Sequence, residues 1–146
     1  MAKDTKYTIL IVDDEPTNVA ILNAMLNCDY KIKVALSGPD ALKIATSSPN
    51  LDLILLDVVM DDMDGFEVCK KLKANTLTSD IPVIFVTSLN DVKRHRKGIE
   101  LGAIDFFEKP FSAPLIKKRI ENHLSAFENY NRIPTNLVSS ENSAKE

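Results

Sequence analysis

Strand-like and helix-like segments alternate five times along this chain of 146 residues. Three strand-like segments, at residues 9–12, 53–56 and 83–86, are continuously apolar. This is typical of strands that are covered on both faces of a parallel sheet. The segment at 30–34 alternates polar and apolar residues, and the one at 103–107 contains a charge, which favours the two edges of the sheet. The alternation indicates an α/β fold with helices on both faces of one parallel sheet.

We therefore predict a doubly wound, five-stranded parallel sheet of flavodoxin-like order 2-1-3-4-5, with helices at about 16–27, 39–47, 65–74, 91–101 and 113–128. In this order the winding reverses between strands 1 and 3, and ligands bind at such a point in open sheets. The length suits one well-buried domain. We predict this domain over residues 1–130, followed by a flexible tail at 131–146, where Pro134, serines and asparagines replace the apolar pattern.

Polar residues that can bind a phosphate or a cation follow four of the predicted strands. Asp13 and Asp14 follow the first strand, Asp57 the third and Thr87 the fourth, and Lys109 is separated from the fifth by one residue. Because the carboxyl ends of parallel strands share one edge, we expect these side chains to meet in one crevice. Carboxylates without His or Cys favour Mg²⁺, or else Mn²⁺. A carboxylate can attack phosphorus there, while the metal and Lys109 offset the developing charge.

The motifs at these strand ends resemble those of the receiver domain of two-component response regulators. The resemblance covers about residues 7–127, and every motif appears in the family's order. The matching segments are IVDDE at 11–15, LLDV at 55–58, MDG at 63–65, VTS at 86–88 and KPF at 109–111.

This resemblance implies a metal-dependent phosphoacceptor. Asp57 would accept a phosphoryl group from a sensor histidine kinase or a histidine phosphotransfer protein. Asp14, Asp57 and the backbone carbonyl of Val59 would bind Mg²⁺, with Asp13 reaching the metal through water.

The resemblance also assigns a conformational switch. Thr87 and Lys109 would contact the phosphoryl oxygens, and Phe106 would be the aromatic residue that turns inward when Thr87 moves towards the phosphate. In the family the peptide bond between Lys109 and Pro110 is cis. The switch would signal to a downstream protein, or to a second copy through the fourth helix, fifth strand and fifth helix.

The loop after Asp57 departs from the family's pattern. Many relatives have proline where Asp61 stands, so the acids at 61, 62 and 64 form either a solvated loop that caps the third helix or a region that attracts cations. Val59 and Leu89 occupy positions that tune phosphate lifetime in the family, and both are apolar. We therefore predict slow self-dephosphorylation.

Composition and charge exclude some classes of protein. The net charge of −3 argues against a nucleic-acid binder, and no apolar run is long enough to span a membrane. We interpret Cys28 and Cys69 as reduced core residues and expect a cytoplasmic protein that catalyses only its own phosphorylation and slow dephosphorylation. One alternative is an aspartate-dependent phosphohydrolase of similar fold, although Val59 stands where such enzymes need a second acid. Another is a receiver cut from a longer multidomain regulator.

Overall fold

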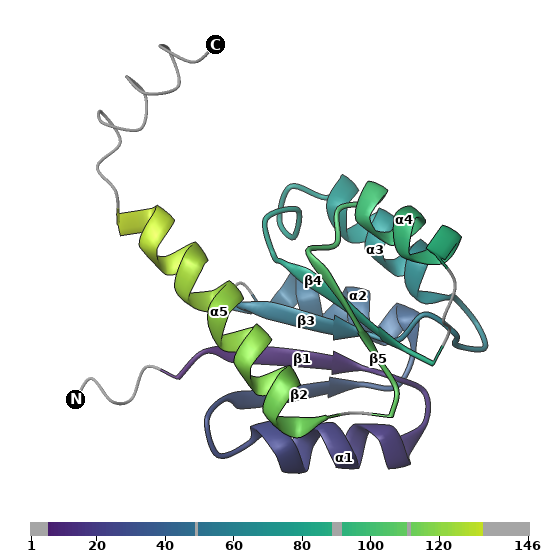
Figure 1. Ribbon diagram of the computed structural model, residues 1–146. Helices are drawn as coiled ribbons and strands as arrows, with labels where there is room; N and C mark the ends of the chain where they lie inside the picture. The colour runs from purple at the N-terminus through teal and green to yellow at the C-terminus, as the bar shows by residue number, and fades with distance from the viewer. Residues whose placement is uncertain (1–5, 49, 89–91, 111, 133–146) are drawn as a thin grey trace. The chain divides into compact units, whose positions relative to one another are not determined.

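The computed structural model describes the backbone at residues 6–48, 50–88, 92–110 and 112–132, and the side chains of these residues except 92–93 and 127–132. Strands and helices alternate through the described chain (Figure 1). The strands are β1 (Thr8–Val12), β2 (Lys31–Ala35), β3 (Leu53–Leu56), β4 (Val83–Thr87) and β5 (Asp105–Glu108). The helices are α1 (Pro16–Leu26), α2 (Gly38–Ser47), α3 (Gly65–Ala74), α4 (Val92–Glu100) and α5 (Ala113–Arg132).

The sheet is entirely parallel and has the predicted strand order, β2-β1-β3-β4-β5. Every residue of β3 and β4 is buried, and so is β1 from its second residue, whereas β2 is largely exposed. The apolar strands therefore lie inside the sheet because only there are both of their faces covered. The register pairs Val12 with Leu56 and Leu56 with Phe85, so the carboxyl ends of the inner strands lie level with one another.

Alternate side chains of the inner strands enter different parts of the core. One set, which includes Leu10, Leu56 and Phe85, forms a single cluster with buried residues of α2 and α3. Buried residues of α1, such as Leu22 and Leu26, do not belong to that cluster. Because successive residues of a strand point to opposite faces, this division matches the predicted doubly wound arrangement.

Local capping fixes the loops that leave the carboxyl edge of the sheet. The Asp64 carboxylate accepts a hydrogen bond from the Glu67 N–H (2.9 Å), so it caps α3 as predicted. Pro16 occupies the first turn of α1, where a missing N–H costs nothing. These caps set where the loops after β1 and β3 end.

The chain divides into two compact units between residues 111 and 112, and α5 belongs to the second. Its Ile116, Ile120 and Leu124 are buried and lie four residues apart, as the predicted apolar stripe requires. The predicted helix at 113–128 was too short, because α5 extends as far as Arg132, the last of the described residues. Residues 133–146, which hold most of the predicted tail, lie outside the described residues.

Three further details correct the sequence-based expectations. Thr87 is the last residue of β4 rather than the residue after it, and β5 spans 105–108 rather than 103–107, so Lys109 follows that strand directly. Cys28 is exposed and therefore does not fill the core, whereas Cys69 is buried, and both are free thiols. No helix within the described residues combines the length and the apolar character that a membrane crossing requires.

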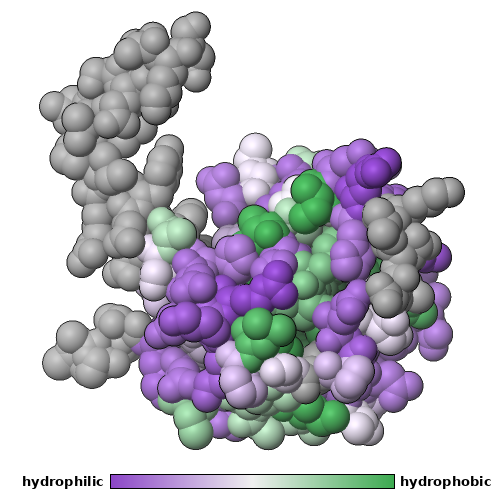
Figure 2. Space-filling view, viewed as in Figure 1, coloured by the Kyte–Doolittle hydropathy of each residue, from purple (hydrophilic) through white to green (hydrophobic). Residues whose placement is uncertain are grey.

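Hydrophilic residues make up most of the face that Figure 2 shows, with smaller groups of apolar residues between them. The exposed large apolar side chains come from many different elements. They are Ile21, Val34, Leu36, Val59, Leu77, Ile99, Ile104 and Leu115. Exposed apolar side chains that are scattered in this way are ordinary on protein surfaces and indicate no function by themselves.

Candidate functional site

The carboxyl edge of the sheet brings the predicted site residues together. Backbone hydrogen bonds hold the residues that follow β3 and β5 against the neighbouring strands. The Asp57 N–H donates to the Val12 carbonyl of β1 (2.9 Å), and the Lys109 N–H donates to the Thr87 carbonyl of β4 (3.0 Å). Asp13, Asp14 and Asp57 each place a carboxylate oxygen within 4.8 Å of the others. They are the one such group of metal-ligand side chains among the residues that the structure describes.

Lys109 connects two of these carboxylates. Its Nζ lies 3.4 Å from Asp13 Oδ2 and 3.3 Å from Asp57 Oδ1. The lysine side chain is 18% exposed and the two carboxylate side chains are almost fully buried, so water screens these contacts only weakly. The peptide bond between Lys109 and Pro110 is cis, as the resemblance implied.

Burial and the nearby Asp13 charge raise the pKa of Asp57 to about 6, and the attraction of Lys109 offsets part of that rise. The carboxylate form of Asp57 is thus costly in the absence of a further cation, because burial removes its hydration and one ammonium cannot balance three acids. A divalent ion at the cluster removes this cost, and all three side chains offer the oxygen ligands that Mg²⁺ prefers. The residues present therefore fit a magnesium ion.

A crevice of about 500 Å³ opens beside the cluster. Its walls come from the loops after β1, β3, β4 and β5 and from the first turn of α1. It is lined by Asp14, Glu15, Asn18, Asp57, Val59, Asp61, Ser88 and Lys109. Glu15 and Ser88 lie within the matching segments at 11–15 and 86–88 but were assigned no role. Asn18, six residues after the end of β1, carried no signal in the sequence.

Thr87, the last residue of β4, is 1% exposed and pairs with Glu108 of β5 in the sheet. This places the threonine at the same edge as Asp57, as predicted. Leu89 lies outside the described residues.

Phe106 is 8% exposed and its ring fills a narrow space between β4 and α4. The ring centroid lies 5.1 Å from that of Phe85 and 4.2 Å from that of His95, which stacks on it at an interplanar angle of 18°. Gly98 of α4 allows this approach, because a Cβ at that position would lie 2.5 Å from two carbons of the Phe106 ring. The inward position of Phe106 thus depends on a helix that presents no side chain at residue 98.

Replacing Gly98 with alanine is expected to lower stability despite the better helix propensity of alanine. Alanine would gain up to about 1 kcal/mol in a helix, but overpacking a core costs about 1–3 kcal/mol. We expect the clash with Phe106 to prevail and to reduce the free energy of unfolding in urea by about 1–2 kcal/mol. Combining Gly98→Ala with Phe106→Leu should recover part of the loss, whereas equal or higher stability of Gly98→Ala alone would contradict this packing.

A five-stranded parallel sheet of this order, with three carboxylates, a threonine and a lysine at its carboxyl edge, is the arrangement expected of a phosphoacceptor protein. The family model of the response regulator receiver domain matches residues 9–121. The chain therefore belongs to the response regulator receiver domain family. Phosphorylation and Mg²⁺ binding are general features of this family.

Named relatives agree with this assignment. The chain is 48% identical over 120 residues to a Vibrio cholerae protein named "Probable cyclic di-GMP phosphodiesterase", covering 82% of this chain and 27% of that protein. It is 42% identical over 115 residues to "Response regulator PleD" of Caulobacter vibrioides, covering 78% of this chain and 25% of the relative. The chain thus spans about a quarter of the length of these two relatives.

Solved structures show the same fold. The receiver domain of a signal transduction histidine kinase from Syntrophus aciditrophicus superposes with a TM-score of 0.73 at 34% identity, covering 82% of this chain and 91% of that one. The chemotaxis response regulator CheY4 of Vibrio cholerae superposes with a TM-score of 0.75 at 26% identity, covering 81% of this chain and 98% of that one.

Proposed function

We propose that this chain is a phosphorylation-controlled switch in which Asp57 accepts the phosphoryl group. One observation carries the proposal: the buried Asp57 carboxylate lies 3.3 Å from Lys109 Nζ, within the acidic cluster, and also lines an open crevice. The carboxylate therefore has access to a donor, while the ammonium needed to balance an incoming phosphate is already present.

Asp14, Asp57 and the Val59 carbonyl would hold Mg²⁺, with Asp13 bound through water, and Mn²⁺ would serve in its place. When all three acids are ionised, the cluster and Lys109 together carry two net negative charges, which a divalent cation neutralises. Bound magnesium would supply charge neutralisation for the phosphoryl oxygens.

The transfer conserves atoms and charge without a further reactant. An Asp57 carboxylate oxygen attacks the phosphorus of a phosphohistidine, and the P–N bond breaks as the O–P bond forms. The electron pair of the broken bond stays on the donor's imidazole nitrogen, which takes up a proton from water. Lys109 leaves the Asp57 oxygen and donates to a phosphoryl oxygen, and the Thr87 hydroxyl donates to another.

Thr87 and Phe106 would then carry the signal. Thr87 of β4 would move towards the phosphoryl group, and phosphorylation would thereby favour the inward position that Phe106 of β5 holds against Phe85 over an outward one. A shift of α4 would alter binding of a downstream protein or of a second copy through α4, β5 and α5. Native mass with and without a phosphate mimic such as beryllofluoride tests the dimer alternative.

Phosphate loss should be slow. Val59 lines the crevice and is 58% exposed, and its apolar side chain cannot orient an attacking water. We expect Val59→Asn to shorten the half-life of the phosphorylated protein several-fold, as read by intact mass after removal of the donor. Leu77→Asn, an equal change at an exposed site outside the crevice, should leave the half-life unchanged. A wild-type half-life of seconds would contradict the prediction.

The phosphate donor in this proposal is a sensor histidine kinase or a histidine phosphotransfer protein, met in the cytoplasm. A small P–N compound, phosphoramidate, tests the chemistry without knowledge of the natural donor. We expect one phosphoryl group per chain in the presence of Mg²⁺ and little in EDTA. The alternative phosphohydrolase would instead turn over p-nitrophenyl phosphate, and we expect no turnover because Val59 replaces the second acid.

A further inference from the structure

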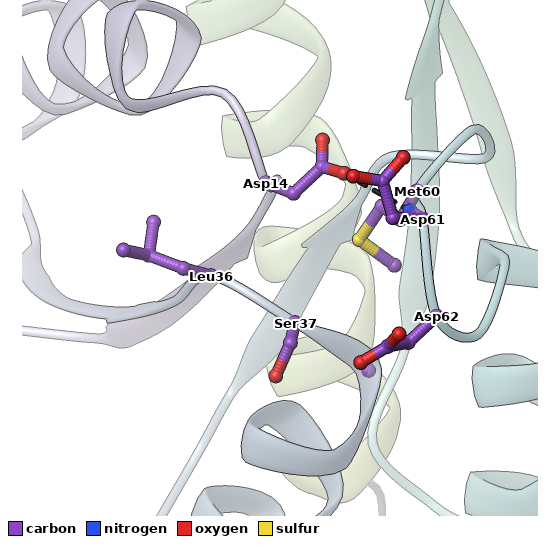
Figure 3. Close-up of a pocket in the computed structure, with 7 residues that line it drawn as sticks. Asp14, Leu36, Ser37, Met60, Asp61 and Asp62 are labelled. Carbon is purple, nitrogen blue, oxygen red and sulfur yellow. Dashed lines mark hydrogen bonds between the residues drawn. The ribbon is translucent and has the colours of Figure 1, made fainter.

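The loop between β3 and α3 contacts the acidic cluster through its backbone. The Asp61 N–H donates a hydrogen bond to Asp14 Oδ2 at 3.0 Å (Figure 3). The two residues are 47 positions apart in the sequence, so this bond joins the loop after β3 to the loop after β1. Bonds of this kind position a carboxylate for its ligand.

The three carboxylates of the cluster differ in the hydrogen-bond donors that fix their orientation. Asp13 accepts from the Glu15 N–H (3.0 Å) and from Lys109, and Asp57 also accepts from Lys109. Asp14 is less buried than the other two acids. Within the described residues, the Asp61 N–H is the one hydrogen-bond donor to the Asp14 carboxylate.

Asp14 and Asp61 lie between the crevice and a second pocket. Asp14 and Asp61 line both the crevice and a second pocket of about 250 Å³, which Leu36, Ser37, Met60 and Asp62 also border (Figure 3). Without the bond, the Asp14 carboxylate would be free to rotate towards this second pocket and away from Asp13 and Asp57. Ordering a side chain on binding costs about 0.5–1.5 kcal/mol. Because the bond already orders the Asp14 side chain in the cation-free protein, the free energy of cation binding does not include this cost.

We infer that Asp61 is a positioning residue of the cation site, and that it acts through its backbone N–H by holding Asp14 towards Asp13 and Asp57. This inference rests on the proposed binding of Mg²⁺. Proline lacks an N–H and cannot make this bond. The contact therefore exists only because this chain departs from the family's frequent proline at residue 61.

The Asp61 carboxylate also attracts cations, so the test must separate its charge from its N–H. Asp61→Ala removes the charge and keeps the N–H, whereas Asp61→Pro removes both. Mg²⁺ affinity is measured by calorimetric titration at low and high salt, because salt screens the exposed charge more than a bond at the cluster. Asp62→Ala is the matched control for loss of one exposed acid in the same loop.

We expect Asp61→Ala and Asp62→Ala to weaken Mg²⁺ binding similarly, by less than about 3-fold, and to match wild type at high salt. Asp61→Pro should weaken binding by a further 3- to 10-fold or so relative to Asp61→Ala, at both salt concentrations. Equal affinities of Asp61→Pro and Asp61→Ala would overturn the inference. Failure of the wild-type protein to bind Mg²⁺ would instead overturn the proposed function.

Hydrogen exchange keeps the inference testable if Asp61→Pro does not fold, which circular dichroism would show. In metal-free wild-type protein the Asp61 amide should exchange at least about 10-fold more slowly than an unprotected amide, and Asp14→Ala should abolish this protection. Unprotected exchange of the Asp61 amide in wild-type protein would refute the bond and the inference with it.

Discussion

Replacing Gly65 with alanine is expected to destabilise this protein by about 3 kcal/mol or more. A Cβ on residue 65 would overlap the Asp57 carbonyl oxygen and lie 2.9 Å from both the Asp57 carbonyl carbon and Val58 Cα. All three atoms belong to the backbone that leaves β3, an inner strand held between β1 and β4. The Gly65 N–H also donates to the Val58 carbonyl at 2.7 Å, so α3 cannot move away without losing this bond.

A Cβ would meet different kinds of atom at residues 65 and 98. At residue 98 the obstacle is the ring of Phe106 and Phe85, which are side chains, whereas at residue 65 it is backbone. Side chains adjust more cheaply than a central strand, so Gly65→Ala should cost more than Gly98→Ala in urea unfolding. It should also reduce phosphoryl incorporation, because the displaced backbone carries Asp57. Wild-type stability of Gly65→Ala would contradict the close approach.

Replacing Asp57 with asparagine is expected to stabilise the metal-free protein at pH 7.5 by about 1–3 kcal/mol. The pKa of Asp57 rises from 3.8 to about 6 on folding, so ionising the folded carboxyl is costly. Well below pH 3.8 the carboxyl is protonated in both states and its burial carries no ionisation cost. As the pH rises towards 6 the unfolded chain ionises first, and stability is lost until the folded carboxyl ionises as well. Asparagine removes this loss.

The gain from Asp57→Asn should therefore be full above about pH 6 and should shrink as the pH falls towards 4. Urea unfolding of both proteins in EDTA at pH 7.5 and 4.5 measures it, with Asp62→Asn as the control for removal of an exposed acid. Addition of Mg²⁺ should stabilise the wild-type protein and have little effect on Asp57→Asn. Lower stability of Asp57→Asn at pH 7.5 would show that Lys109 outweighs burial and Asp13.

The sequence predicted the sheet and its carboxyl edge because local patterns encode both. Continuous apolar runs can be covered on both faces only inside a parallel sheet, and this placed Asp13 and Asp57 side by side. The element ends were less predictable. Four residues of α5 were missed because residues 129–132 do not continue the apolar pattern by which the helix was recognised.

Contacts that depend on the path of a loop or the position of a helix were not predictable. The bond from Asp61 to Asp14 requires two loops to meet, and no periodic pattern describes either loop. The stacking of His95 on Phe106 requires α4 to lie close to β5, which follows from the absence of a side chain at Gly98. These contacts arise from tertiary packing and become visible only in three dimensions.

Intact mass after incubation with acetyl phosphate and Mg²⁺ shows whether Asp57 is the phosphoacceptor of the crevice. The wild-type protein and Asp62→Asn, which changes an acid outside the crevice, should each gain the mass of one phosphoryl group. Asp57→Asn should gain none while remaining folded. Phosphorylation of Asp57→Asn to the wild-type level, or an unmodified wild-type protein under the same conditions, would contradict the account.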